Sequence, residues 1–377
     1  MEAVRFGYKE KLSTNRINLE IFACTIILLM TSMLKYLFVD INFSDIDNFD
    51  YMLKVLYIFL ISVSSSVLWD FLFYIYKLFG KKKISFKEYL FKVYSSFSFV
   101  SGGIIALLLP IGIELYLVPL VTFISIVIGK LAFGGYGNNL INSSLLGIVV
   151  VGLVFNPSYY LGNVREDITS NIELITTPLF ETISFPETFN NLYNSSAINL
   201  TQIFNGYYLG EIGTTNSFAL LIIFVYLLGS RINNLRLSVT YLLSYFILSL
   251  LLFGLSKNNL SMLLHNSFSY VIVGPILFMS IFIIPDSVTS PLTRGGKVSY
   301  ALIMSLVTFY LRLLFNSTYY IYIGVLGINL ISSIISRYIA YKRNTKLEYI
   351  SLIVLSTISI ASIFVYLWLK NMLFFQL

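Results

Sequence analysis

Residues 51–76 have the sequence YMLKVLYIFLISVSSSVLWDFLFYIY, and this apolar stretch decides the fold class. It exceeds the length of about 20 residues that a helix needs to cross the hydrocarbon layer of a bilayer. Similar stretches recur along the chain, which is 57% hydrophobic and only 11% charged. Soluble domains carry roughly a quarter charged residues, so a single soluble core does not explain this composition. The sequence therefore predicts an all-α polytopic membrane protein.

Eleven stretches have the length and hydrophobicity of membrane spans, so we expect ten or eleven transmembrane helices. They cover residues 17–38, 51–76, 94–110, 113–132, 141–157, 214–230, 237–255, 268–285, 299–315, 319–341 and 348–369.

The lysine and arginine residues are unevenly distributed between alternate connections of these spans. With the N-terminus in the cytoplasm, the inner segments receive 19 of them and the outer segments 5, Lys35 and Lys54 included. Cytoplasmic loops carry such an excess of basic residues. We therefore expect a multi-pass protein of the cell membrane with a cytoplasmic N-terminus. The inner residues are Arg5, Lys9, Lys11, Arg16, Lys77, Lys81, Lys82, Lys83, Lys87, Lys92, Lys130, Arg231, Arg236, Arg294, Lys297, Arg337, Lys342, Arg343 and Lys346.

A long polar connection divides the spans into two groups of five and leaves one further span at the C-terminus. Because five is odd, the two groups would insert with opposite orientation, as in inverted-repeat transporters. The sequence LVTF at residues 120–123 recurs at residues 306–309. We therefore expect a first membrane repeat at 1–157, an outer loop at 158–213, a second membrane repeat at 214–341 and an extra C-terminal helix at 342–377.

Glycine and proline interrupt corresponding spans of the two groups. The third span contains Gly102-Gly103 and ends at Pro110, and the eighth contains Gly274-Pro275 and ends at Pro285. Such interruptions are typical of the broken helices that line binding sites in these folds.

The cysteine and histidine content limits the redox chemistry. Cys24 is the only cysteine and His265 the only histidine, so an iron–sulfur cluster and the usual zinc site are excluded within this chain, and a haem would find one histidine ligand at most. A redox function would need an organic cofactor or a site shared with partners. The net charge of +7 comes from residues at span ends, so it does not indicate nucleic-acid binding.

Two of the charged residues inside predicted spans, Asp70 and Arg312, are functional candidates. Asp70 follows Trp69 near the inner end of the second span, where a carboxylate indicates either an ion path or a pair with Lys77 at the interface. Arg312 lies inside the ninth span, where it would meet a phosphate group or pair with a carboxylate.

Four segments resemble those of a known family, which contains the D subunit of the Rnf electron-transport complex and the B subunit of the sodium-pumping NADH:quinone oxidoreductase. They are VSGGIIALLLP at 100–110, similar to V-T-G-L-L-L-A-L-x-L-P; GGYGNNLINSSLLG at 134–147, similar to G-G-L-G-x-N-x-F-N-P-A-L-x-G; GYYLGEIGTTNSFA at 206–219, similar to G-N-I-x-G-S-I-G-E-T-S-A-L-A; and DSVTSPLTRGGK at 286–297, similar to D-x-V-T-S-P-x-T-x-x-G-K. The sequence departs from these patterns at Ser143-Ser144, which replace Pro-Ala, at Ile148, which replaces Arg, and at Thr214, which replaces Glu.

The resemblance implies a covalently bound flavin. The family carries FMN on a threonine of the outer loop within D-x-x-S-G-A-T-P-L, and this chain has NIELITTPL at residues 171–179. The implied cofactor is FMN on Thr177, next to Pro178, with Thr176 as a competing hydroxyl and riboflavin as an alternative flavin.

The glycine-rich segments would approach the flavin ring, or would serve close helix packing. The cofactor-binding candidates there are Gly134, Gly135, Gly137, Asn139, Asn142, Gly210, Gly213 and Thr215. We expect no catalytic residue and no metal site in this chain, and Asp70 as part of an ion path.

The function that the resemblance implies is that of a membrane subunit in an Rnf-type ion-translocating ferredoxin:NAD oxidoreductase, which moves Na⁺ or H⁺ and is not active as a single chain. Its partners would be other Rnf-type membrane subunits, a flavin-bearing subunit, a flavin transferase and the lipid bilayer, without nucleic acid. Two alternatives stay open: a flavin-free channel or transporter on the same scaffold, and a structural subunit that supports assembly.

The charge distribution predicts the topology. Cysteines introduced as Ser85→Cys and Ser195→Cys in a Cys24→Ser background would be treated with an impermeant thiol reagent. In intact cells, we expect labelling at position 195 but not at position 85. The reverse pattern would contradict the orientation.

Overall fold

The computed structural model describes residues 14–38, 48–79, 85–155, 204, 210–254, 260–291, 294–314 and 318–341. These residues form helices, and the β-structure among them is one isolated antiparallel bridge between Pro110 and Glu211. The predicted all-α fold class is thereby confirmed. The termini of the chain and most of the predicted outer loop at 158–213 lie outside the described residues.

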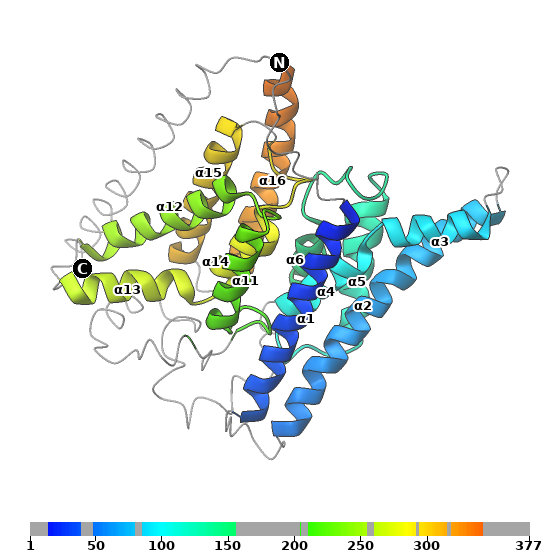
Figure 1. Ribbon diagram of the computed structural model, residues 1–377, viewed down its shortest axis with the longest axis horizontal. Helices are drawn as coiled ribbons and strands as arrows, with labels where there is room; N and C mark the ends of the chain where they lie inside the picture. The colour runs from blue at the N-terminus through cyan, green and yellow to red at the C-terminus, as the bar shows by residue number, and fades with distance from the viewer. Residues whose placement is uncertain are drawn as a thin grey trace, which may run out of the picture.

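The first group of helices begins with α1 (Thr14–Phe38) and α2 (Asn48–Phe79), which lie side by side (Figure 1). Next, α3 (Phe86–Ser95) projects from the end of α2, to which Tyr89 ties it by donating to the Phe71 carbonyl at 2.7 Å. The short α4 (Ser98–Leu108) packs against both α1 and α2. It is followed by α5 (Leu117–Phe123), the π-helix η1 (Ile124–Leu131) and α6 (Ser143–Phe155).

The second group contains α11 (Ser217–Gly229), α12 (Leu235–Gly254), α13 (Leu260–Ile272), α14 (Pro275–Phe278), the π-helix η2 (Met279–Ile283), α15 (Arg294–Leu314) and α16 (Thr318–Tyr341). Here α12 packs against α13 and α15, and α16 packs against α15. The two groups meet where α11 contacts α1 and α16 contacts α6.

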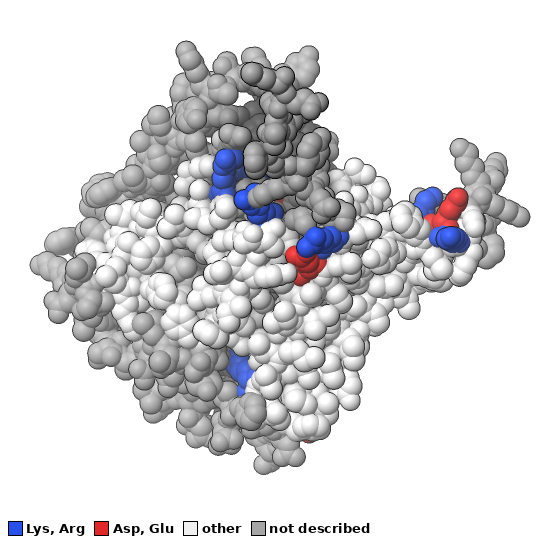
Figure 2. Space-filling view, viewed as in Figure 1, with Lys and Arg blue, Asp and Glu red and all other residues white. Residues whose placement is uncertain are grey.

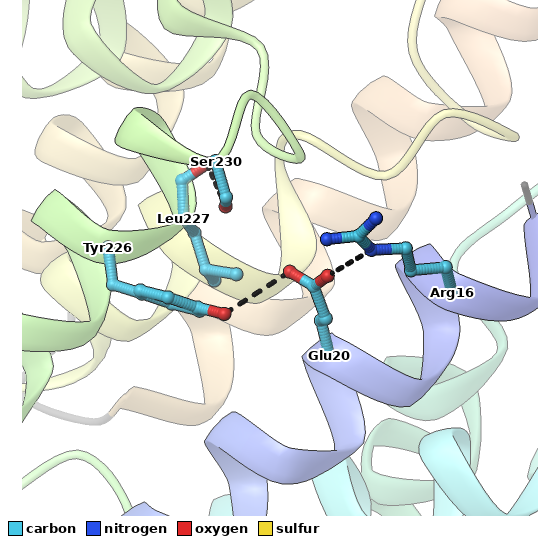
Figure 3. Close-up of polar contacts among 5 residues, drawn as sticks. All are labelled: Arg16, Glu20, Tyr226, Leu227 and Ser230. Atoms are coloured by element: carbon cyan, nitrogen blue, oxygen red, sulfur yellow. Dashed lines mark hydrogen bonds and ion pairs between the residues drawn. The ribbon is translucent and has the colours of Figure 1, made fainter. Parts of the chain in front are cut away.

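A polar contact joins the two groups between α1 and α11. Glu20 on α1 accepts a hydrogen bond from the Tyr226 hydroxyl on α11 at 3.3 Å, and it forms an ion pair with Arg16 at 2.9 Å (Figure 3). Two turns of helix far apart in sequence are therefore held together at their surface.

The described helices overlap the predicted spans. Three of them are long and apolar enough to cross a membrane, Thr14–Leu37, Phe49–Ile75 and Leu235–Gly254; α3 and α4 together form a fourth such stretch, Phe86–Leu108, and a bent pair adds a fifth. Shorter apolar helices cover 117–131, 143–154, 217–229 and 319–332. The protein is thus a multi-pass membrane protein, whereas the total of ten or eleven spans stays a prediction; the span at 348–369 lies outside the described residues.

The eighth predicted span, 268–285, is not one straight helix. Leu263–Ile272 and Pro275–Ile283 meet at a bend of 60°. The cause is local: Gly274 has φ +86°, a conformation that favours glycine, and Pro275 lacks the N–H that would continue the helix. The expected break at Gly274-Pro275 is therefore present.

By contrast, Gly102-Gly103 do not interrupt a helix, because both lie inside α4. A Cβ at position 102 would lie 2.8 Å from the Ser62 carbonyl, and one at position 103 would lie 2.9 Å from the Thr25 hydroxyl. These glycines let α4 approach α2 and α1 closely, so the expectation of a second broken helix at this pair was wrong. The helix ends instead before Pro110.

The surface of the described part is largely apolar. Many apolar side chains of α1, α2, α11 and α12 are about half exposed, among them Met30, Leu60, Ile222 and Leu243. Figure 2 shows one face that is mostly uncharged, with a few charged side chains across it and others on the projecting α3. Such a continuous apolar surface suits contact with lipid chains.

The two copies of LVTF make matching contacts. Thr122 accepts from Trp69 on α2 at 3.2 Å, and Thr308 shares a hydrogen bond with Tyr241 on α12 at 3.1 Å. The next residue, Phe123, meets the Trp69 ring edge-on with centroids 5.0 Å apart. Phe309 meets the Tyr245 ring in the same way at 5.3 Å.

Tight glycine packing predicts a position-dependent cost of substitution. In Gly147→Ala, the new Cβ on α6 would lie 2.2 Å from the Val121 carbonyl, so we expect a loss of about 1–3 kcal/mol in stability. Gly327→Ala on α16 meets no atom within 4 Å and should be neutral or stabilising. Thermal unfolding of both variants in detergent checks this, and equal melting temperatures would contradict it.

Candidate functional site

The four segments that carry the family resemblance meet in pairs. The first and third are joined by backbone hydrogen bonds, since the Ile212 N–H donates to the Leu109 carbonyl at 3.1 Å and the Gly213 N–H donates to the Leu107 carbonyl at 2.6 Å. The second and fourth come together through Tyr136 and Asp286, whose side chains interact electrostatically. Contacts between residues more than 100 positions apart in sequence therefore join these segments at two places.

The first site lies where α4 begins and contains Asp70. This side chain is 1% exposed, and neither carboxylate oxygen has a hydrogen-bond partner in the described part of the chain. The Ser96 and Ser98 hydroxyls lie nearby and act on the carboxylate, but their geometry is not that of hydrogen bonds to it. A buried carboxylate without a direct partner is costly, so its environment must compensate in another way.

That compensation comes from Lys130 on η1, which is also 1% exposed. Its ammonium group donates to the Ser96 carbonyl and, at 2.9 Å, to the Ser98 hydroxyl. The acceptors are available because Phe97, with φ +52°, separates α3 from α4 at this point. The Ser98 hydroxyl thus interacts with both the Lys130 ammonium and the Asp70 carboxylate.

Lys130 connects carboxylates from both helix groups. Its positive charge acts on Asp70 of α2 and on Asp286, which follows η2. The Asp286 carboxylate accepts from the Val288 N–H at 3.1 Å and so also shapes its own turn. The Lys77 side chain, the partner considered from the sequence, lies outside the described residues.

The placement of Lys130 corrects the sequence analysis, which counted it among the basic residues of inner loops. Its side chain is buried within the helical core instead. A position count assigns any basic residue at a span end to the nearest loop. The α3–α4 break that receives this ammonium group is a tertiary feature, and the sequence gives no sign of it.

The glycine-rich segment after η1 owes its composition to its backbone. Gly134, Gly135 and Gly137 have φ values of +107°, +95° and +92°, which residues with a Cβ rarely adopt. Asn142 accepts from the N–H groups of Ser144 and Leu145, and so caps the start of α6.

The amide oxygen of Asn139 is buried and has no partner in the described structure. It is therefore an acceptor in this segment that a bound group could use.

The second site lies where α4 ends. Gly210 begins the described segment there, and Gly213 packs so tightly that an added Cβ would lie 2.6 Å from the Leu107 Cβ. The Thr215 hydroxyl is fully buried and has no partner among the described residues. The predicted cofactor residues thus fall into two groups, one near each end of α4, while Thr176, Thr177 and Pro178 lie outside the described residues.

Glu211 at this second site was not predicted from the sequence. Its carboxylate is buried at 6% exposure and accepts from the Tyr322 hydroxyl of α16 at 2.8 Å. The signal for it is a charged residue in an apolar context between the glycines of the third segment.

Arg312 on α15 lies among aromatic side chains. Its guanidinium group donates to the Tyr270 carbonyl at 2.6 Å and to the Tyr245 hydroxyl at 3.4 Å. It also lies 4.2 Å from the centre of the Tyr270 ring, a cation–π contact. The arginine therefore ties α15 to α12 and α13.

A family model described as "NQR2, RnfD, RnfE family" matches residues 7–345, which is most of the chain. The chain belongs to this family. The resemblance found in the four segments is therefore confirmed for the family as a whole.

Among its relatives in the NQR2, RnfD, RnfE family, the B subunit of the Na⁺-translocating NADH-quinone reductase of Stutzerimonas stutzeri (strain A1501) is 28% identical over 216 residues, 57% of this chain and 52% of the relative. The D subunit of the Na⁺-translocating ferredoxin:NAD⁺ oxidoreductase complex of Acetobacterium woodii is 29% identical over 219 residues, 57% of this chain and 62% of the relative. The chain thus spans between about half and two thirds of the length of these curated relatives.

Proposed function

We propose that this chain is a membrane subunit of an Rnf-type, redox-driven ion-translocating ferredoxin:NAD oxidoreductase, in which it carries part of the electron and ion path. The family match over residues 7–345 is the observation that carries this proposal. The relatives named above are subunits of Na⁺-translocating complexes, and this supports partners of the same kind here: other membrane subunits and a flavin-bearing subunit.

The proposed architecture is that of two inverted repeats. Matching contacts of Thr122 and Thr308, and of Phe123 and Phe309, with aromatic residues on α2 and α12 support this. In such folds, the binding sites lie where helices are broken. Both ends of α4 and the bend at Gly274 fit that arrangement.

The ion path in this proposal includes Asp70. Its carboxylate is buried without a hydrogen-bond partner in the described structure, and Lys130 supplies the nearby positive charge. Carboxylates in such positions are rare in membrane domains and commonly mark ion or proton pathways. The lysine would balance the charge of Asp70 when no transported ion is present.

Covalent FMN on Thr177 is the second part of the proposal, with a flavin transferase as the partner that attaches it. The support is the sequence Thr177-Pro178-Leu179 in the long connection. The buried Thr215 hydroxyl, without a partner among the described residues, fits hydrogen bonding to this flavin, whereas the unpartnered Asn139 amide oxygen belongs to the group of residues at the other end of α4. A bound flavin would supply the electron-transfer chemistry, while Thr215 would orient it.

Substitution of Asp70 tests the ion path. In membrane vesicles with the assembled complex, Asp70→Asn should lower redox-driven ion transport by about tenfold, since a carboxamide lacks the charge that attracts a cation. Ser64→Ala on the exposed face of the same helix is the matched control and should transport normally. Normal transport by a stably assembled Asp70→Asn complex would remove Asp70 from the path.

Intact-mass measurement tests the flavin. The chain would be co-expressed with a flavin transferase as wild type, Thr177→Ala, Thr177→Val and Thr176→Ala. We expect an FMN adduct on the wild type and on Thr176→Ala only, because a phosphoester needs the hydroxyl at position 177. An adduct on Thr177→Ala would exclude this site.

An unmodified wild-type mass would instead favour a flavin-free channel or transporter on the same scaffold. The specific observation behind this second candidate is the replacement of the family's Ser-Gly-Ala before the threonine by Leu174, Ile175 and Thr176.

A further inference from the structure

Residues 211–213, which precede α11, are held in place by backbone hydrogen bonds to the end of α4. The N–H groups of Ile212 and Gly213 donate to carbonyls of Leu109 and Leu107 at the end of α4, and Glu211 pairs with Pro110. The close approach of Gly213 to Leu107 leaves little freedom to shift this register. The position of the Glu211 side chain is therefore fixed by the fold.

The Glu211 carboxylate is buried and receives only neutral donors. Tyr322 donates to one oxygen at 2.8 Å, and the Thr214 hydroxyl donates to the other at 2.7 Å. In the part of the chain that the structure describes, no lysine or arginine forms an ion pair with Glu211. A buried carboxylate held by hydroxyl groups alone is poorly compensated as an anion.

The helix end beside Glu211 adds to this imbalance. The C-terminal end of a helix carries a partial negative charge, which disfavours a carboxylate and attracts a cation. The environment of Asp70 is the opposite one. Asp70 interacts with Ser98 at the N-terminal end of the same helix and with the positive charge of Lys130. The two buried carboxylates are thus separated by α4, a helix about 15 Å long at its usual rise.

The family pattern explains why the carboxylate is at position 211. In G-S-I-G-E-T-S, serine corresponds to position 211 and glutamate to position 214, whereas this chain has Glu211 and Thr214. Because the two side chains touch at 2.7 Å, exchanging them moves the carboxylate by about one hydrogen-bond length. Both arrangements pair one carboxylate with one hydroxyl at the same place.

We propose that Glu211 is the carboxylate of a monovalent-cation site, for H⁺ or Na⁺, at the end of α4 opposite to Asp70, and that Glu211 and Thr214 are exchanged relative to the family pattern. Tyr322 of α16 holds the carboxylate in place, so the site joins both helix groups. This inference deepens the proposed function, since it supplies a second station for the translocated ion.

Thermal unfolding of the purified full-length chain in detergent tests this site without any redox partner. One arm compares NaCl with choline chloride at equal ionic strength and fixed pH, and the other compares pH 8 with pH 6 in choline chloride. Because a ligand that binds only the folded state stabilises it, the wild type should gain about 3 °C or more in one arm. The responding arm identifies the cation.

The variants assign the response to the carboxylate. Glu211→Ser and the isosteric Glu211→Gln should lose most of the gain in melting temperature. The exchange variant Glu211→Ser/Thr214→Glu should regain it. Glu114→Gln, which removes an exposed carboxylate that follows α4, is the matched control and should retain the gain due to Glu211.

Three results would overturn the inference. They are no wild-type response in either arm, an undiminished response in Glu211→Gln, and a folded exchange variant that does not regain the response. If the cation response holds but the assembled complex transports no ions, the proposed function fails while the binding site stands.

Discussion

The structure depends on how backbone polar groups are satisfied where a helix stops inside the membrane domain. No water is available there, so carbonyl groups freed by the end of α4 need donors from the protein itself. The N–H groups of Ile212 and Gly213 provide them at Leu109 and Leu107. This pairing ties the entry to the second helix group onto the first group. It also explains the requirement for glycine at position 213, where a side chain would strike Leu107.

The same constraint governs the other end of α4. The left-handed backbone conformation of Phe97 breaks the helix between α3 and α4. Lys130 donates to the Ser96 carbonyl and the Ser98 hydroxyl at this break. The lysine is thereby held near Asp70, which has no direct hydrogen-bond partner in the described structure. Backbone satisfaction and charge compensation are therefore served by one side chain. In the proposed ion path, this charge would also set the affinity of the Asp70 carboxylate for a cation.

Sequence patterns predicted the helices well because hydrophobic length and glycine–proline chemistry act locally. The span expected at 237–255 is α12, Leu235–Gly254, and Gly274-Pro275 bends the chain as their backbone preferences require. The candidate site was less accessible. Asp70 was found as a lone carboxylate, but its relation to Lys130 depends on the packing of η1 against α2, and the contact of Glu211 with Tyr322 joins residues 111 apart in sequence. Gly102 shows the converse error, since close helix packing and helix breaking both select glycine.

The two helix groups share apolar and aromatic contacts more than charges. Trp69 and Tyr245 occupy matching places against Phe123 and Phe309, yet the residue after Trp69 is Asp70 and the residue after Tyr245 is Phe246. Lys130 and Arg312 each donate to a backbone carbonyl; the lysine also acts on Asp70 of its own helix group, and the arginine lies over the Tyr270 ring. Packing contacts must be kept in both groups for each to fold, whereas a path with a direction requires different polar groups at its two ends. In the proposed pair of inverted repeats, these two demands would keep matching packing residues such as LVTF and would let the charged positions diverge, so that a short sequence match accompanies similar contacts.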